Sequence, residues 1–302
     1  MKKKIKNIFA LSFFLVICFT LSAEMKVGIG RKVITPQQYP IWMGGYASRD
    51  KPANSIFHDL WAKALVIEYS PQSRVIIVTM DLHKLSRQIS EAVFKQINEK
   101  YGINRSQLLL NVSHTHSGPM VWPNADMLDF KLSDQQAVFL YSQELINDLV
   151  YVVDIAMNNL EPMLVSSGHG STNFAINRRE LTDKGIIIGV NPNGPVDHDV
   201  PVLKIETPDG TLRAVLFGYA CHNTTLGGDY YQINGDYAGF AQIELEKAHP
   251  GITAMFFQGC GGDINPNPRG TLENAKQNGI LLANAVEKVL ASELHPVRPP
   301  IR

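Results

Sequence analysis

The sequence predicts an α/β fold in one large domain, with a mixed sheet or sheets flanked by helices and an active site at the carboxyl ends of strands. Two observations support this prediction. Apolar, β-rich runs alternate along the chain with longer stretches of helical periodicity. Polar clusters containing His, Asp, Ser and Gly directly follow four of the apolar runs. Interleaved strands and helices favour a sheet covered by helices, and ligands bind beyond the carboxyl ends of such strands.

The first 23 residues are typical of a secretory signal peptide. Four lysines within the first six residues precede an apolar run over 8–21, and the small residues Ser22 and Ala23 follow it. The apolar run is shorter than the roughly 18 residues that a membrane span needs. We therefore expect export to the periplasm or the medium, with 24–302 as the mature domain.

Composition is that of a globular enzyme, with 45% hydrophobic and 19% charged residues. Removal of the leader takes four Lys and no acid, which leaves 24 basic against 28 acidic residues and a net charge of −4. This balance does not favour a nucleic-acid partner. Two cysteines remain, Cys221 and Cys260; both follow predicted strands, so we expect near neighbours, and their bonding is left open.

The elements can be placed in order along the chain. Strands are predicted at 61–69, 74–80, 107–113, 211–220 and 252–258, and helices at 86–100, 134–159, 237–248 and 271–292. Ser133 or Asp134 is expected to cap the second helix, and Thr271 to open the last. The segment 168–200 is rich in Gly, Asn and Asp and predicts long loops around one short strand at 185–190. The Pro-rich end is interpreted as a domain boundary or a truncated sequence.

Four polar clusters, at 81–83, 113–119, 221–225 and 259–263, follow predicted strands and are expected at one sheet edge. His114 and His116 are two residues apart, so on a continuing strand they would face the same side. Neutral imidazole is a common zinc ligand in catalytic sites that keep one position for water. The alternative is a hydrogen-bonding histidine pair. The other histidines are expected to be structural, with His83 the nearest exception.

The Gly-rich turn at 259–263 has two interpretations. Its amides, at Gly261 and Gly262, could stabilise an oxyanion, or the turn could need glycine for positive φ. Asp263 would orient a ligand or cap the turn. Arg178 and its neighbour Arg179 could clamp an anionic or carbonyl group, although a solvated surface pair is the more frequent explanation.

Seven motifs together resemble the N-terminal domain of the neutral, non-lysosomal ceramidases. They are VGIGRKVITP, MGGYA, TMDLH, NVSHTHSGP, GYACHNTT, NGDYAGFAQ and FFQGCGGDINPN, in the family's order and context, and the resemblance runs from Val27 to the end of the chain. HTHSGP is the most specific of them. The family is one of zinc amidohydrolases that cleave the amide between a fatty acid and a sphingoid base, which implies a lipid or other small-molecule substrate and is compatible with peripheral membrane contact.

The resemblance also implies roles for individual residues. His114 and His222 would bind zinc, and His116 would lie beside the scissile carbonyl. A Glu and a Tyr from further along the chain complete the family's zinc shell, and this sequence has no positions for them. The family reads NAGDxSPN at the Gly-rich turn where this chain has Asn265 in place of the Ser, so Asn265 and Asp263 are the catalytic candidates there.

Three acidic residues, Asp81, Asp236 and Asp263, are candidates to replace the missing zinc ligands. Of these, Asp81 is expected to orient a ligand imidazole and Asp236 to cap a helix. Two other functions remain open. A two-metal phosphoesterase would use Asp81, His83, Asp263 and Asn265 as ligands, and an inactive glycan- or lipid-binding module would retain the fold alone.

Overall fold

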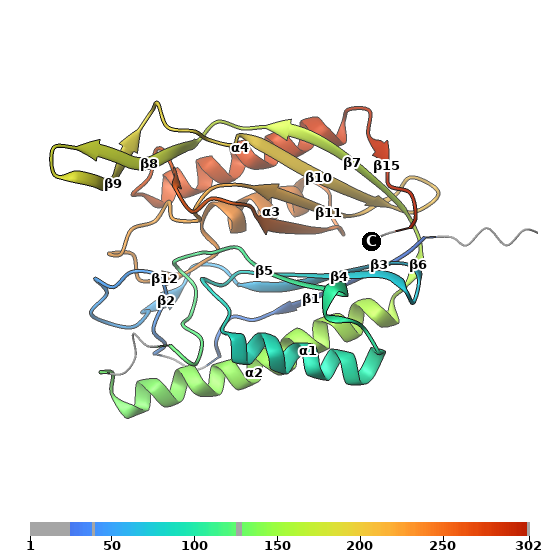
Figure 1. Ribbon diagram of the computed structural model, residues 1–302, viewed down its shortest axis with the longest axis horizontal. Coiled ribbons are helices and arrows are strands. Elements are labelled where there is room, and N and C mark those ends of the chain that lie inside the picture. Colours follow the sequence, from blue (N-terminus) through green and yellow to red (C-terminus); the bar gives the residue numbers. More distant parts are fainter. Residues whose placement is uncertain (1–24, 38–39, 125–128, 301–302) are drawn as a thin grey trace, which may run out of the picture.

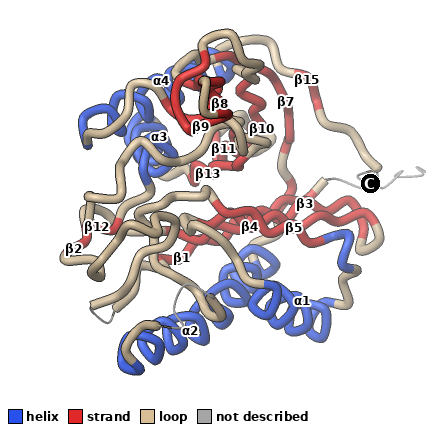
Figure 2. Tube along the Cα trace, turned by 60° about the vertical axis from the view of Figure 1, so that its left-hand side comes forward, coloured by secondary structure: helices blue, strands red, loops and turns tan. Residues whose placement is uncertain are grey.

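The computed structural model describes residues 25–37, 40–124 and 129–300, and the predicted signal peptide at 1–23 lies outside them. Two five-stranded sheets stack face to face, and a pair of helices covers the outer face of each sheet (Figures 1 and 2). This mixed α/β architecture agrees with the predicted fold class. Within the described ranges, no helix is both long enough and apolar enough to cross a membrane.

The first sheet has the strand order β5-β4-β3-β1-β6. Its strands are β1 (Lys26–Val33), β3 (Trp61–Ser70), β4 (Ser73–Met80), β5 (Leu108–Val112) and β6 (Glu161–Pro162), and its helices are α1 (Arg87–Tyr101) and α2 (Leu132–Asn158). β4 and β5 run parallel, whereas the other pairs are antiparallel. A 3-10 turn, η1 (Arg105–Gln107), leads into β5.

The second sheet has the order β13-β11-β10-β7-β15. Its strands are β7 (Leu164–Ser171), β10 (Asp199–Glu206), β11 (Leu212–Tyr219), β13 (Thr253–Gln258) and β15 (His295–Pro296), with helices α3 (Asp236–Ala248) and α4 (Leu272–Leu290). β11 and β13 are parallel. The smaller sheets are β2 (Ser55–Ile56) with β12 (Gln232–Ile233), and β14 (Ile264–Pro266) with β8 (Ala175–Thr182) and β9 (Gly185–Asn191).

Three apolar cores hold these four layers together. One lies between the first sheet and α1 and α2, and another between the second sheet and α3 and α4. The third lies between the two sheets, where Leu65 of β3, Val165 of β7 and Leu216 of β11 are buried. Because each sheet is buried on both faces, its central strands are apolar almost throughout, as in WAKALVIEY.

The helix ends follow local capping chemistry. Ser86 accepts the backbone N–H of Ile89 at the start of α1, and Gly102 ends that helix with φ 63°. Thr271 caps α4, as predicted. The predicted cap of α2 is wrong, because the helix begins at Leu132 and the Asp134 carboxylate instead accepts the indole N–H of Trp42 at 3.0 Å.

The short strand predicted at 185–190 is confirmed as β9, but the long loops predicted around it are wrong, because the rest of 168–200 contributes to β7, β8 and β10 (Figure 1). The glycines of β7 reflect close helix packing and not a loop. A Cβ on Gly170 would lie 2.7 Å from the side chain of Val289 in α4, and one on Gly168 would lie 2.9 Å from the same residue. Small residues let α4 lie directly on the strand.

Candidate metal centre

Four histidines gather where two pairs of parallel strands end. His83 follows β4, His114 and His116 follow β5, and His222 follows β11. The expectation of a single sheet edge is wrong, since β4 and β5 belong to the first sheet and β11 to the second. The two sheets are joined beside the site, where the side chain of Asn111 exchanges hydrogen bonds of 2.9 and 3.1 Å with the backbone of Gln258.

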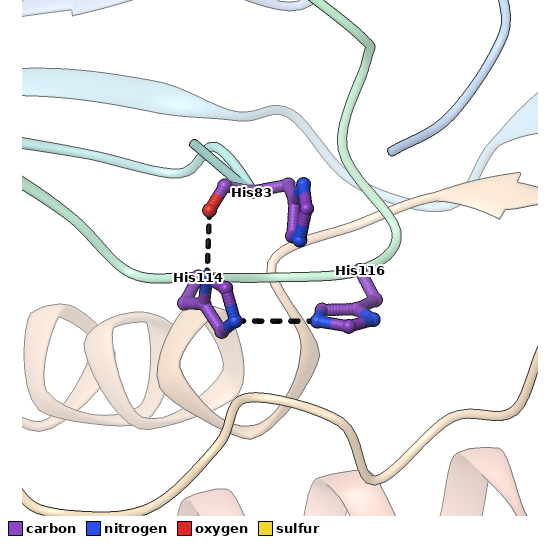
Figure 3. Close-up of side chains that lie close together, drawn as sticks. All are labelled: His83, His114 and His116. Atoms are coloured by element: carbon purple, nitrogen blue, oxygen red, sulfur yellow. Dashed lines mark hydrogen bonds between the residues drawn. The ribbon is translucent and has the colours of Figure 1, made fainter. Parts of the chain in front are cut away.

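Three of the four imidazoles lie close enough to one another to share an ion. Nitrogens of His83, His114 and His116 all lie within 4.8 Å of one another (Figure 3), so this cluster could hold a metal ion. The Nε2 atoms of His114 and His116 are 3.4 Å apart. The ring of His222 packs edge-on against that of His114, with centroids 4.7 Å apart.

Two of the rings are oriented by backbone carbonyls. Nδ1 of His114 donates to the carbonyl oxygen of His83 at 2.7 Å, and Nδ1 of His222 donates to that of Gly261 at 2.6 Å. Because a carbonyl oxygen only accepts, each neutral ring carries its proton on Nδ1 and its lone pair on Nε2. This is the orientation in which histidines bind metals.

The backbone turns sharply at His114, which has φ 60°. The pair at 114 and 116 is therefore not on a continuing strand as expected, and the two rings meet through their Nε2 atoms instead. Positive φ at a non-glycine residue is uncommon, and sparsely populated backbone conformations are frequent at functional sites.

All four imidazoles are held neutral. Desolvation, followed by repulsion from His114, lowers the pKa of His83 to about 3, and desolvation is also the largest cause that lowers the pKa of His222 to about 4. The pKa values of His114 and His116 are lowered for the same reason. Neutral imidazole is the form that binds a metal. The Nδ1 atoms of His83 and His116 are buried without a hydrogen-bond partner, so the cluster has unused donor and acceptor capacity.

The Gly-rich turn serves the site through its carbonyls. The amide of Gly261 donates to the carbonyl of Gly259 at 2.8 Å, so the expectation that this amide faces an oxyanion is wrong. Positive φ is not the reason for glycine either, since neither Gly261 nor Gly262 has it. Glycine is needed at 261 because a Cβ there would lie 2.6 Å from the backbone nitrogen of Cys221.

The other candidates of this turn lie beside the histidines. Arg178, on β8, donates from Nη2 to the carbonyl of Gly262 at 2.8 Å and from Nη1 to Oδ1 of Asn265 at 3.2 Å. Asn265 is buried in β14. The Asp263 carboxylate accepts from the Asn177 side chain at 3.4 Å, and its carbonyl accepts the N–H of Arg178, so Asp263 ties the turn to β8.

The roles expected of Asp81 and Asp236 are wrong. The buried Asp81 carboxylate accepts the backbone N–H of Trp61 at 3.0 Å and the Gln242 side chain at 3.1 Å, while carbonyls orient the imidazoles. Asp236 is the first residue of α3, with Gly235 as the cap. Its carboxylate accepts the backbone N–H groups of Tyr237 and Leu226.

The contacts of Arg49 and Tyr46 with His116 were not predicted from the sequence. Arg49 is only 7% exposed and donates to the carbonyls of Gly44, His116 and Tyr230 at 2.9, 2.6 and 3.1 Å. Burial lowers its pKa to about 10, so the guanidinium stays charged at pH 7. The ring of Tyr46 packs edge-on to His116 with centroids 4.7 Å apart. The MGGYA motif was the available signal for this loop.

The two cysteines are free thiols, with Cys221 buried and Cys260 exposed. Their segments are neighbours, because Gly261 packs against the backbone of Cys221. Burial raises the pKa of the Cys221 thiol, so this cysteine is unreactive in the folded protein.

The fold and the histidine cluster define a mixed α/β protein with a candidate metal centre. Residues 25–286 match the family described as "Neutral/alkaline non-lysosomal ceramidase, N-terminal", and the chain belongs to that family. It is 25% identical to the neutral ceramidase of Pseudomonas aeruginosa over 252 residues, which cover 80% of this chain and 37% of that protein. It is 26% identical to neutral ceramidase B of Dictyostelium discoideum over 270 residues, covering 82% of this chain and 36% of the relative.

Solved structures of the family share the fold. The crystal structure of the P. aeruginosa neutral ceramidase superimposes with a TM-score of 0.75 at 22% identity, over 92% of this chain and 46% of that one. A structure described as "Ceramidase complexed with C2" gives a TM-score of 0.77 at 23% identity, over 92% and 45% of the two chains. The chain thus spans less than half the length of these relatives.

Proposed function

We propose that the chain is an exported zinc-dependent hydrolase of the neutral ceramidase type, which cleaves an N-acyl amide such as ceramide or a related molecule. Family membership supports the reaction class. The observation that carries the proposal is the pair formed by His114 and His222. Both rings are anchored through Nδ1 to a backbone carbonyl, and their centroids are 4.7 Å apart.

In this proposal His114 and His222 hold the zinc ion through Nε2. Bound zinc supplies Lewis acidity and lowers the pKa of water to about 7, which provides a nucleophile for the amide carbon. A catalytic zinc normally has three protein ligands. The family resemblance implies a Glu and a Tyr as further ligands, and the described residues contribute the two histidines.

The chain's own residues supply the remaining chemistry. His116 is buried and neutral, with Nε2 3.4 Å from that of His114, and it would donate a hydrogen bond to the scissile carbonyl. Asn265 has no hydroxyl to act as a nucleophile, but its side-chain amide can donate to a developing oxyanion. Arg178 is placed to bind the polar part of the substrate.

The competing functions have less support. A two-metal phosphoesterase needs carboxylate ligands. The Asp81 and Asp263 carboxylates instead accept hydrogen bonds from protein donors. The histidine cluster found among the described residues contains neither aspartate. An inactive binding module would have no need of four neutral imidazoles, two of them oriented by backbone carbonyls. A measured turnover separates this alternative from the proposal.

Export and the nature of the substrate are part of the same proposal. The basic and apolar leader supports transport to the periplasm or the medium. Relatives named neutral ceramidases support a lipid substrate, which implies peripheral contact with a membrane. Sequencing of the mature protein tests the export step, because cleavage after Ala23 would leave Glu24 as the first residue.

The catalytic proposal is tested with purified protein, added zinc and a panel of N-acyl amides that includes ceramide. We expect release of the fatty acid, and its loss in His114→Ala and His222→Ala. His249→Ala is the matched control, since His249 pairs with Glu287 at 2.9 Å, between α3 and α4. Full activity in His114→Ala, or none in the parent protein on any amide, would contradict the proposal.

A further inference from the structure

Besides Arg49, which is bound to three carbonyls, further arginines lie beside the histidine cluster without a carboxylate partner in the described part of the chain. Arg178, Arg179 and Arg269 form no ion pair within the ranges that the structure describes, although other arginines on the surface, such as Arg213, do. We propose that Arg178, Arg269 and the side-chain amide of Asn265 form a subsite for an anionic group. The amide that this chain cleaves would then carry a carboxylate on its amine side, as an N-acyl amino acid does. This inference rests on the proposed function and names its substrate class.

Arg178 is connected to the proposed metal ligand His222 through one turn. Consecutive carbonyls hold the two side chains, that of Gly261 accepting from His222 at 2.6 Å and that of Gly262 accepting from Arg178 at 2.8 Å. The guanidinium has five N–H donors, and its Nε is buried without a protein acceptor. Arg178 is therefore held in place, with donors to spare, next to the group that would bind the reacting amide.

Arg269 approaches the same site from the side of His116. Its Nη2 donates to the hydroxyl of Tyr46 at 3.3 Å, and the Tyr46 ring packs against His116. Desolvation and then the positive charges of Arg179 and Arg269 lower the pKa of Arg178, which shows that the arginines are near enough to repel one another. A bound anion would offset that repulsion.

Asn265 completes the donor set. Its Oδ1 accepts from Arg178 at 3.2 Å and from Thr224 at 3.4 Å, which leaves its Nδ2 as a donor with no acceptor in the described part of the chain. The side chain is 4% exposed. Asparagine at this position thus orients Arg178. The serine of the family pattern is shorter, so its hydroxyl would not reach Arg178 from the same backbone position. An amide N–H beside a guanidinium matches the two oxygens of a carboxylate.

The local charge balance agrees with an anionic ligand. The charge of Asp263 acts on Arg178, but its carboxylate is bound to Asn177 and not to the guanidinium. Arg178 also lies near the positive charges of Arg179 and Arg269, and the four imidazoles of the cluster are neutral. A zinc ion would add further positive charge, so a substrate with a carboxylate is favoured over a neutral one.

The test compares two substrates that differ only in charge, N-hexanoylglycine and N-hexanoylglycinamide, with the full chain and added zinc. We expect kcat/KM for N-hexanoylglycine to exceed that for N-hexanoylglycinamide by tenfold or more, because hydrogen bonds to a charged group are the stronger ones. Arg178→Gln should reduce this ratio to about one, mainly by raising KM for the carboxylate. Arg213→Gln, which alters a surface arginine paired with Glu161, should leave the ratio unchanged.

Calorimetric binding of N-hexanoylglycine separates the subsite from the reaction. Hydrolysis of N-hexanoylglycine and N-hexanoylglycinamide at equal rates would overturn the subsite and leave the proposed function standing. Binding that depends on Arg178 without hydrolysis would support the subsite and contradict the proposed function, and the absence of both would overturn both. N-hexanoyltaurine is a second probe: an equal preference for its sulfonate supports an anion subsite, and a preference for the carboxylate alone supports recognition of a planar group.

Discussion

Replacement of Gly261 by alanine should damage both the fold and the metal site, whereas the same change at Gly262 should not. A Cβ at 261 would lie 2.6 Å from the backbone nitrogen of Cys221 and 2.8 Å from its Cα and carbonyl carbon. These are backbone atoms two residues beyond the end of β11, so they cannot move aside as a flexible side chain would. At Gly262 an added Cβ meets nothing within 4 Å. The pair is therefore a matched comparison.

The magnitude follows from the contact. Overpacking of this kind costs about 1–3 kcal/mol, and we expect the upper half of that range because the obstructing atoms belong to the main chain. The midpoint of thermal unfolding would then fall by roughly 4–10 °C for a domain of this size. The Gly261 carbonyl also orients His222, so zinc affinity should fall by about tenfold or more. Gly262→Ala should stay within about 0.5 kcal/mol.

Urea unfolding and zinc titration of both variants measure these effects. The gain in stability from a less flexible unfolded chain is common to the two changes, so it cancels in their difference. Equal stability and equal zinc affinity in the two variants would show that the contact between Gly261 and Cys221 constrains neither the fold nor the metal site. Loss of stability without loss of zinc affinity would refute the role of the Gly261 carbonyl alone.

Three further predictions concern other parts of the molecule. Burial lowers the pKa of His83 to about 3, below its ordinary value of about 6.5, so the unfolded chain takes up the proton first on acidification. The free energy of unfolding of the metal-free protein should therefore be lower at pH 5 than at pH 7.5. An equal or higher value at pH 5 would contradict this prediction. In the native protein a thiol reagent should modify Cys260 at once and Cys221 only after unfolding, and equal rates would be inconsistent with their burial. Lys63→Met should lower the free energy of unfolding by about 3 kcal/mol, because the buried ammonium donates to three oxygens, one of them from Glu246; an unchanged urea midpoint would show the network to be dispensable.

The apolar strands and the amphipathic helices could be predicted from the sequence. The run at 61–69 corresponds to β3 (Trp61–Ser70), and the pattern at 271–292 to α4 (Leu272–Leu290). Strands β1 and β7 could not be recognised, because their glycines lie under helices and interrupt the apolar pattern. A Cβ on Gly28 would lie 1.8 Å from the carbonyl of Ala156 in α2, so the constraint comes from tertiary packing that periodicity does not report.

The site was predictable in its residues but not in its arrangement. His114, His116 and His222 follow strand ends and carry the family motifs, and the structure brings them together. The division of the strands between two sheets was not predictable, since local patterns do not specify which strands pair. His83 was undervalued because its contribution depends on the packing of β4 beside β5, which also lets its carbonyl orient His114.

Zinc affinity measured on three histidine variants identifies the residues that hold the metal. We assign the metal to His114 and His222, whereas the distances between imidazole nitrogens would also allow a site formed by His83, His114 and His116. We predict that His114→Ala and His222→Ala each lower the zinc affinity of the chain at least tenfold, while His83→Ala lowers it less than about threefold. Unchanged affinity in His222→Ala together with a large loss in His83→Ala would contradict the claim and move the metal to the other cluster.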